Sequence, residues 1–313
     1  IEATSLAPAV PARARMSPLL TVTLLALLLG TQPITTDLYL PALPALTEGF
    51  NASVAQAQLT LTTLLLAFGV SQLVWGPLSD RFGRRPVLLW GLSAYTLASI
   101  GCALAPSMPL LIVWRTVQGA AMGAAVMGAR AIVRDLYTPE TGARVMSKGL
   151  TGLGIIACIC APLGGLLSDL LGWRYALTTL TLFGAVTLTL VAWRFQETVP
   201  RKNPLALRPG TLVSTWLTIV RNPTFLTWSA LSTASYAGLF TFLASSSFIF
   251  IKVLGLTRTQ YGVVMFSMAF MYIMGTLMCR RLLPRFGLRR TVAIAGFFTL
   301  TGGTLMGVIG LLR

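Results

Sequence analysis

The sequence predicts an all-α membrane protein. Of its 313 residues, 55% are hydrophobic and only 10% are charged, and histidine is absent. A soluble domain typically carries about 25% charged residues. Apolar runs of about 20 residues recur along the chain, and a helix of that length crosses a hydrocarbon core of about 30 Å. These observations favour a polytopic protein whose apolar surface faces lipid.

Nine apolar runs predict nine membrane-spanning helices. They cover residues 18–38, 56–78, 86–105, 109–133, 145–168, 173–194, 224–249, 260–279 and 291–311. The Ala- and Pro-rich residues 1–16 are expected to form a disordered N-terminal extension. We then expect an N-terminal six-helix bundle over residues 17–195, a proline-containing cytoplasmic linker over residues 196–223, and a partial C-terminal bundle of three helices over residues 224–313.

The basic residues predict the orientation of the chain. The net charge is +16, but the basic residues fall in short loops between apolar runs rather than in one stripe, which argues against nucleic-acid binding. Alternate loops differ in charge: one set holds many basic residues, and the other set holds only Arg174, Lys252 and Arg258. By the positive-inside rule, the N-terminus is expected in the cytoplasm.

A charged hinge interrupts the apolar sequence at residues 76–85, which read Gly-Pro-Leu-Ser-Asp-Arg-Phe-Gly-Arg-Arg. A charge near the bilayer centre costs about 2.5–3.5 kcal/mol on insertion scales, so the hinge is expected at a water boundary. Gly76 is expected to let two backbones approach closely, and Asp80 to accept hydrogen bonds from a facing helix N-terminus. The simpler alternative is an ordinary basic loop. The candidate gate residues are Gly76, Asp80, Arg81, Gly83, Arg84, Arg85 and, at the end of the fourth run, Asp135.

This hinge resembles the loop between helices 2 and 3 of the major facilitator superfamily in residue types, spacing and position. Part of it returns as Arg285-Phe-Gly-Leu-Arg-Arg290, as expected of a transporter built from two parallel halves. Upstream, Asp37-Leu-Tyr-Leu-Pro41 resembles the Bcr/CflA drug-resistance exporters, which are twelve-helix drug/proton antiporters. The resemblance implies the major facilitator fold, with the chain truncated after the ninth helix. It also implies an inner gate closed by an ion-pair network, in which Arg134 and Asp135 join Asp80 and Arg84. Separately solvated loop charges are the alternative to that network.

The resemblance also implies a function, namely proton-coupled export of drugs across the bacterial inner membrane by alternating access. The expected partners are a small-molecule drug, protons and the lipid bilayer, and the expected state is a monomer without a cofactor. A metabolite or sugar transporter of the same fold and an inactive truncated remnant are the alternatives. Enzymatic and metal sites are not expected, because the sequence has no phosphate-binding Gly-rich loop with Lys, no nucleophile elbow and no metal-ligand spacing.

Asp37 is the one acidic residue placed within a predicted span, between Pro33 and Pro41. A carboxyl group alone in a low-dielectric medium binds a proton more readily than in water, and a nearby cation opposes this effect. Arg115, within the fourth run, is the expected partner, and it resembles the arginine that the superfamily links to proton transfer. The alternatives are that Asp37 ends a helix at the outer water interface and that Arg115 snorkels to it.

Two further groups of residues are candidates for transport. In the fifth run, Ala161, Pro162, Gly164 and Gly165 resemble the antiporter signature of drug exporters, and small residues with a proline favour a bent, closely packed helix. Tyr39, Gln118 and Tyr236 are the candidate substrate-binding residues. Aromatic walls with few hydrogen-bonding groups suit varied amphipathic ligands, although an aromatic residue in a span is more often there for packing.

Overall fold

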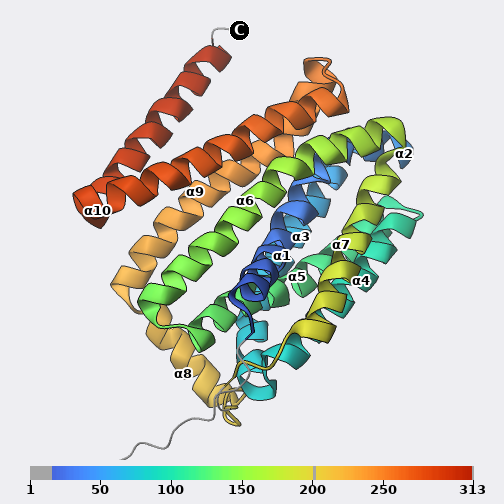
Figure 1. Cartoon of the computed structure of the whole chain (residues 1–313). Helices are drawn as coiled ribbons and strands as arrows, with labels where there is room; N and C mark the ends of the chain where they lie inside the picture. The colour runs from blue at the N-terminus through green and yellow to red at the C-terminus, as the bar shows by residue number, and fades with distance from the viewer. Residues whose placement is uncertain (1–15, 200–201, 312–313) are drawn as a thin grey trace, which may run out of the picture.

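The computed structural model describes residues 16–199 and 202–311, and all the regular elements in those ranges are helices (Figure 1). The predicted N-terminal extension, except Met16, lies outside the described residues. The elements are α1 (Pro18–Asp37), η1 (Leu40–Ala42), α2 (Leu43–Gly49), α3 (Val54–Phe82), α4 (Arg84–Leu104), α5 (Met108–Leu136), α6 (Pro139–Leu170), α7 (Trp173–Arg194), α8 (Pro209–Val220), α9 (Pro223–Ser247), η2 (Phe248–Val253) and α10 (Arg258–Leu311).

Eight helical segments in the described ranges are long and apolar enough to cross a membrane. They coincide with the first eight predicted runs. The ninth run, 291–311, forms the last part of α10. Gly287 has φ 72° and ψ 172°, a conformation that a helix does not contain, and α10 therefore turns sharply there into two arms (Figure 1).

The boundaries of the helices follow local sequence signals. Ser53 and Gln56 form a capping box at the start of α3. Gly83 separates α3 from α4 with φ 109°, which an L side chain rarely adopts. Beyond α1, the chain continues through Pro41 and Pro44, because each lies in the first turn of a new helix, where a missing N–H is tolerated.

The predicted linker contains a helix that was not predicted from the sequence. α8 is exposed along its length, and it is shorter than a membrane span. Before it, residues 204–207 form a turn. A run of twelve residues gives a weak hydropathy signal, and the surrounding prolines suggested an irregular connection.

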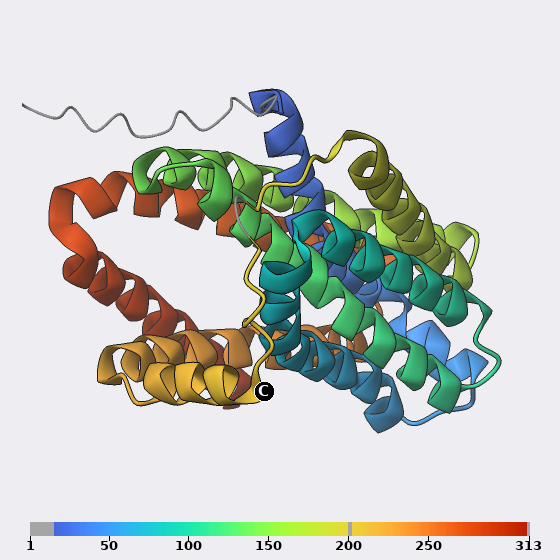
Figure 2. The same ribbon diagram turned by 90° about the horizontal axis from the view of Figure 1, so that it is seen from below.

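The helices α1–α7 pack around two large buried clusters. One cluster holds α2, η1 and the adjoining ends of α4, α5 and α6, and the other holds α1, α4 and α5 near the opposite end of the bundle. The first arm of α10 packs along α6. Figure 2 shows α8, α9 and the second arm of α10 gathered on one side of α1–α7. The packing of α6 against α10 is therefore the main contact between the N-terminal and C-terminal helices.

Candidate functional site

Arg84 is the centre of an ion-pair cluster at one end of the bundle. Its Nε lies 2.7 Å from Asp135 Oδ2, and its Nη1 lies 2.7 Å from Asp80 Oδ1. The same nitrogen donates a hydrogen bond to Ser79 Oγ at 2.7 Å. Arg134 lies farther from Asp80, at 3.8 Å. We call Asp80, Arg84 and Asp135 the gate cluster, and their end of the bundle the gate end.

Burial makes this cluster more than a set of solvated loop charges. The Arg84 side chain is 4% exposed and that of Asp135 is 8% exposed, whereas Arg134 is 71% exposed. Two carboxylates and a serine hydroxyl occupy the donors of the Arg84 guanidinium. A buried charge needs such partners to offset its desolvation. The predicted ion-pair geometry is therefore present.

Glu197, which is not among the predicted site residues, is the carboxylate that caps α4 beside this cluster. Its Oε1 accepts a hydrogen bond from the backbone N–H of Arg84 at 2.9 Å, and its Oε2 accepts one from Arg85 at 3.2 Å. These are unsatisfied donors in the first turn of α4, where negative charge is favourable. A Cβ at Gly83 would collide with the Glu197 carboxylate. Asp80, which was expected to cap a facing helix, pairs with Arg84 instead.

The segment after α7 is tied to the gate cluster by further hydrogen bonds. The backbone N–H of Asn203 donates to the carbonyl of Asp80 at 2.9 Å. Arg81 donates to the carbonyl of Pro204 at 3.3 Å, and Arg85 donates to that of Ala192 at 2.8 Å. These two predicted gate residues therefore contact the segment after α7 and the end of α7, respectively. The close approach expected at Gly76 is not formed, because a Cβ added there would meet no described atom within 4 Å.

Asp37 ends α1 between the N-terminal and C-terminal helices. The side chain is partly buried, and it accepts a hydrogen bond from Thr36 Oγ1 at 2.7 Å. It lies near enough to Cys160 of α6 and Tyr261 of α10 for its charge to act on both. Within the described ranges it forms no ion pair. A carboxylate thus faces the contact between the two groups of helices.

Arg115 is fully buried but does not form the predicted ion pair with Asp37. It donates hydrogen bonds to Gln118 Oε1 at 2.7 Å and to the carbonyl of Thr35 at 3.1 Å. Its guanidinium carbon lies 4.1 Å from the centre of the Tyr39 ring, a cation–π contact. Thr35 and Asp37 are two positions apart and therefore about 200° apart around a helix. Arg115 of α5 thus contacts one face of α1, and Asp37 lies on another.

Two of the predicted substrate-binding residues belong to the buried network around Arg115. Gln118 donates to Ser99 Oγ at 2.7 Å, and the Tyr39 hydroxyl lies 2.8 Å from Thr60 Oγ1. Both side chains are fully buried, so neither is open to a ligand in this conformation.

Tyr236, the third predicted substrate-binding residue, is not brought to the other two. It lies exposed on α9, and its ring stacks on that of Phe240. In the network around Arg115, the Nε atom of Arg115 is a buried donor without a partner among the described residues.

The antiporter-like residues of α6 form a seam of close backbone contacts. A Cβ at Gly164 would collide with the carbonyl of Leu38 in the α1–η1 connection, and one at Gly165 would collide with the carbonyl of Arg258 at the start of α10. From the other side, a Cβ at Gly262 would be too close to the backbone of Ala161 and Pro162. Small residues therefore allow α6 to contact α1 and α10 at once.

Two ion pairs join the N-terminal and C-terminal helices at the end opposite to the gate end. Lys252 Nζ of η2 lies 2.6 Å from Glu48 Oε1 of α2. Arg258 Nη1 lies 3.7 Å from Asp169 Oδ1, and Asp169 also accepts a hydrogen bond from the backbone N–H of Thr259 at 2.8 Å. Neither pair was predicted from the sequence. We call these four charged residues the latch, and their end of the molecule the latch end.

Comparisons with known proteins show the family of the chain. The Major Facilitator Superfamily model matches residues 25–312. Multidrug resistance protein D of Escherichia coli (strain K12) is 32% identical over 244 residues, which are 77% of this chain and 60% of that protein. A chloramphenicol resistance protein of Pseudomonas aeruginosa is 29% identical over 274 residues, or 87% of this chain and 64% of that protein. The chain thus spans less than two thirds of the length of these relatives.

A solved structure shows the same fold. The bacterial homologue of the human lysosomal transporter Spinster, in an inward-facing and unoccupied conformation, superposes with a TM-score of 0.63 at 19% identity. The match covers 86% of this chain and 62% of that chain. The resemblance predicted from residues 76–85 and the expected fold class are thereby confirmed, and this multi-pass membrane protein belongs to the major facilitator superfamily.

Proposed function

We propose that the protein exports drugs or other amphipathic small molecules across the bacterial inner membrane in exchange for protons, by alternating access. The observation that carries the proposal is the position of Asp37 between α1, α6 and α10. A carboxyl group at the contact between moving helices is a candidate to bind a proton in one state and a substrate in the other. The names of the drug-resistance relatives support the substrate class.

The coupling step is an exchange at one carboxyl group. When Asp37 has released its proton, its negative charge attracts a substrate that carries a positive charge or hydrogen-bond donors. A returning proton neutralises the carboxylate and removes that attraction. A tenfold proton gradient supplies about 1.4 kcal/mol, and a membrane potential of 100 mV adds about 2.3 kcal/mol per charge.

Arg115 takes part in this step through α1 rather than through direct contact. It holds the backbone of α1 two residues before Asp37, at the carbonyl of Thr35. A buried cation there stabilises negative charge nearby, and its fixed position keeps α1 in register with α5. Tyr39 and Gln118 hold the guanidinium in place.

The two ends of the molecule supply the alternation. The latch joins the N-terminal and C-terminal helices at one end, and the seam of α6 lets α10 move while it stays in contact. The gate cluster stabilises the junctions among α3, α4 and α5 at the other end. The proposal includes a cytoplasmic N-terminus and gate end, a monomeric carrier, and N-terminal and C-terminal bundles at residues 17–195 and 224–313.

The test is drug-dependent proton movement in everted membrane vesicles that contain the natural gene product, with chloramphenicol among the drugs. Asp37→Asn keeps the size of the side chain and removes the titratable group, so drug-induced proton release should be abolished. Asp37→Glu keeps the carboxyl group and should retain measurable coupling. Unchanged coupling in Asp37→Asn would reject Asp37 as the coupling acid. Inward movement of a sugar or metabolite with the proton would indicate an importer. If no compound is transported, the protein is inactive.

A further inference from the structure

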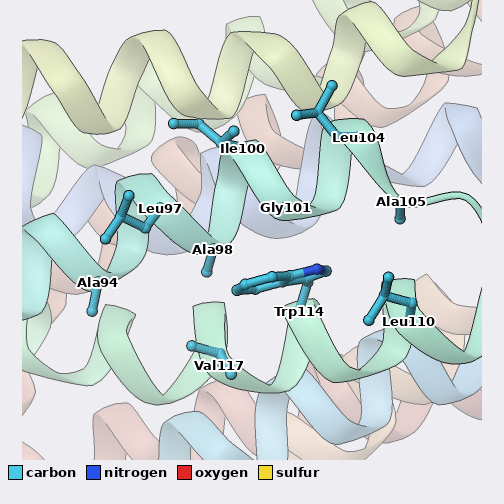
Figure 3. Close-up of a pocket in the computed structure, with 10 residues that line it drawn as sticks. All are labelled: Ala94, Leu97, Ala98, Ile100, Gly101, Leu104, Ala105, Leu110, Trp114 and Val117. Atoms are coloured by element: carbon cyan, nitrogen blue, oxygen red, sulfur yellow. The ribbon is translucent and has the colours of Figure 1, made fainter.

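A cavity of about 630 Å³ lies between α4 and α5 (Figure 3). Its lining is apolar throughout, and it includes Ala94, Leu97, Gly101 and Leu104 of α4 and Trp114 and Val117 of α5. The Trp114 ring packs on Gly101, where a Cβ would collide with it. We call this cavity the α4–α5 groove.

The groove opens on the outer surface of the helices. Leu97 and Leu104 at its rim are 63% and 75% exposed, and Val117 across from them is also exposed. Both helices are long and apolar enough to cross the membrane. From Ala94 to Ala105 a helix rises about 16 Å, which matches half of a hydrocarbon core of about 30 Å. The groove therefore has the length of one leaflet of acyl chain.

A second cavity, of about 430 Å³, lies at the latch end of the groove and has both polar and apolar walls. Asn51 lines it from the turn between α2 and α3, Gln56 from the first turn of α3, and Ser107 from the loop between α4 and α5. The two cavities are adjacent, because Ala105 and Leu110 line the groove and residues 106–109, between them in the sequence, line the second cavity. We call the second cavity the polar pocket. An apolar and a polar compartment thus adjoin where the helices leave the membrane.

Arg174 lies at the junction of the two compartments. Its Nη2 donates to the carbonyl of Ala105, a groove residue, in a long hydrogen bond of 3.4 Å. Its guanidinium carbon is 5.9 Å from the centre of the ring of Phe50, a residue of the polar pocket, and 4.2 Å from that of Trp173. The side chain is exposed and forms no ion pair with a described residue. Its remaining N–H donors are therefore free for an anion.

We propose that the α4–α5 groove, Arg174 and the polar pocket form one binding site for a phospholipid of the adjacent leaflet. An acyl chain fills the groove, the phosphate binds the Arg174 guanidinium, and the polar headgroup enters the pocket of Asn51, Gln56 and Ser107. The apolar lining and leaflet-length groove select a hydrocarbon chain, and the positive charge at its end selects an anionic group. This site is separate from Asp37 and does not depend on the proposed transport.

The test is native mass spectrometry of the purified, delipidated protein titrated with phosphatidylglycerol. Arg174→Gln should weaken the first lipid adduct about tenfold, as expected for loss of a charge-assisted contact. Val117→Trp should do so by filling the groove. Arg194→Gln and Val186→Trp, which change an exposed arginine and an exposed valine of α7 outside the site, are the matched controls and should bind like the wild type.

Two further arms identify the ligand and guard against misfolding. Diacylglycerol, which lacks the phosphate, should bind more weakly and should not distinguish Arg174→Gln from the wild type. A phosphatidylglycerol with a photoreactive acyl chain should crosslink to residues 94–105 and 110–117 in the unaltered protein. Equal binding by all variants, or crosslinks spread over all lipid-facing helices, would show ordinary annular lipid and overturn the proposal.

Discussion

Glu48 and Lys252 are 204 positions apart in the sequence, but the Oε1 of the first and the Nζ of the second are 2.6 Å apart. The contact joins α2 to η2 and thus the N-terminal helices to the C-terminal helices. Together with the pair of Arg258 and Asp169, it joins the two groups of helices at the latch end. A transporter that alternates must break these pairs once in each cycle.

The latch should set the balance between closed and open states of this end. Both side chains of the Glu48–Lys252 pair are largely exposed, so the pair is worth up to about 1 kcal/mol, or about a fivefold change in population. We expect Lys252→Glu to increase the open population by repulsion. Pulsed electron paramagnetic resonance between labels at Leu171→Cys and Val253→Cys, in a background without the exposed Cys279, would measure it.

The charge-swapped double variant, Glu48→Lys with Lys252→Glu, is the control for this prediction. It restores opposite charges at the same positions and should return the distance distribution toward that of the wild type. If the single and double variants open equally, the effect is not electrostatic, and the pair is not a latch.

The gate cluster should contribute to stability in proportion to burial rather than to the number of charges. Arg84→Gln leaves the buried Asp135 carboxylate with only the long, 4.0 Å contact to the exposed Arg134, which costs about 3–5 kcal/mol of unfolding free energy. Arg134→Gln removes an exposed arginine beside the cluster, with longer contacts to Asp80 and Asp135, and should cost at most about 1 kcal/mol. Thermal unfolding in detergent compares the two.

A double variant separates charge from packing in this prediction. Adding Asp135→Asn to Arg84→Gln removes the unpaired carboxylate, so part of the lost stability should return. Equal destabilisation by Arg84→Gln and Arg134→Gln would contradict the view that Arg84 is the centre of the cluster.

The membrane helices were predictable because hydropathy is a property of each segment. A run of about 20 apolar residues has few alternatives to a spanning helix, and eight runs therefore coincide with eight helices. α8 was missed because twelve residues do not produce that signal. The Arg84–Asp80 pair could be anticipated, because the two residues are four positions apart in one motif.

The missed parts of the site depend on contacts that the sequence does not display. Arg115 was assigned to the correct helix but to the wrong partner, because helix boundaries do not say which face of α1 meets α5. Glu197 was not assigned to the cap because its partners are backbone N–H groups, which every residue has. For the latch a signal was available: Lys252 and Arg258 are the rare cations of loops that share their predicted side with Glu48 and Asp169.

The α6–α10 seam should tolerate no added carbon at Gly262. A Cβ added at Gly262 would press on the backbone of Ala161 and Pro162, and the backbone cannot move aside as a flexible side chain can. Overpacking of this kind costs about 1–3 kcal/mol. We expect Gly262→Ala to lower the unfolding temperature and to slow transport, because α10 can no longer lie against α6.

Gly275→Ala on the same helix is the matched control, because a Cβ there meets no described atom within 4 Å. In a helix with open space around it, alanine is favoured over glycine by about 0.5–1 kcal/mol, so this variant should be neutral or slightly stabilised. The pair isolates close backbone contact from helix propensity. If Gly262→Ala behaved like Gly275→Ala in both unfolding and transport, α6 and α10 would not need to touch, and the seam could not be the surface on which the two groups of helices move.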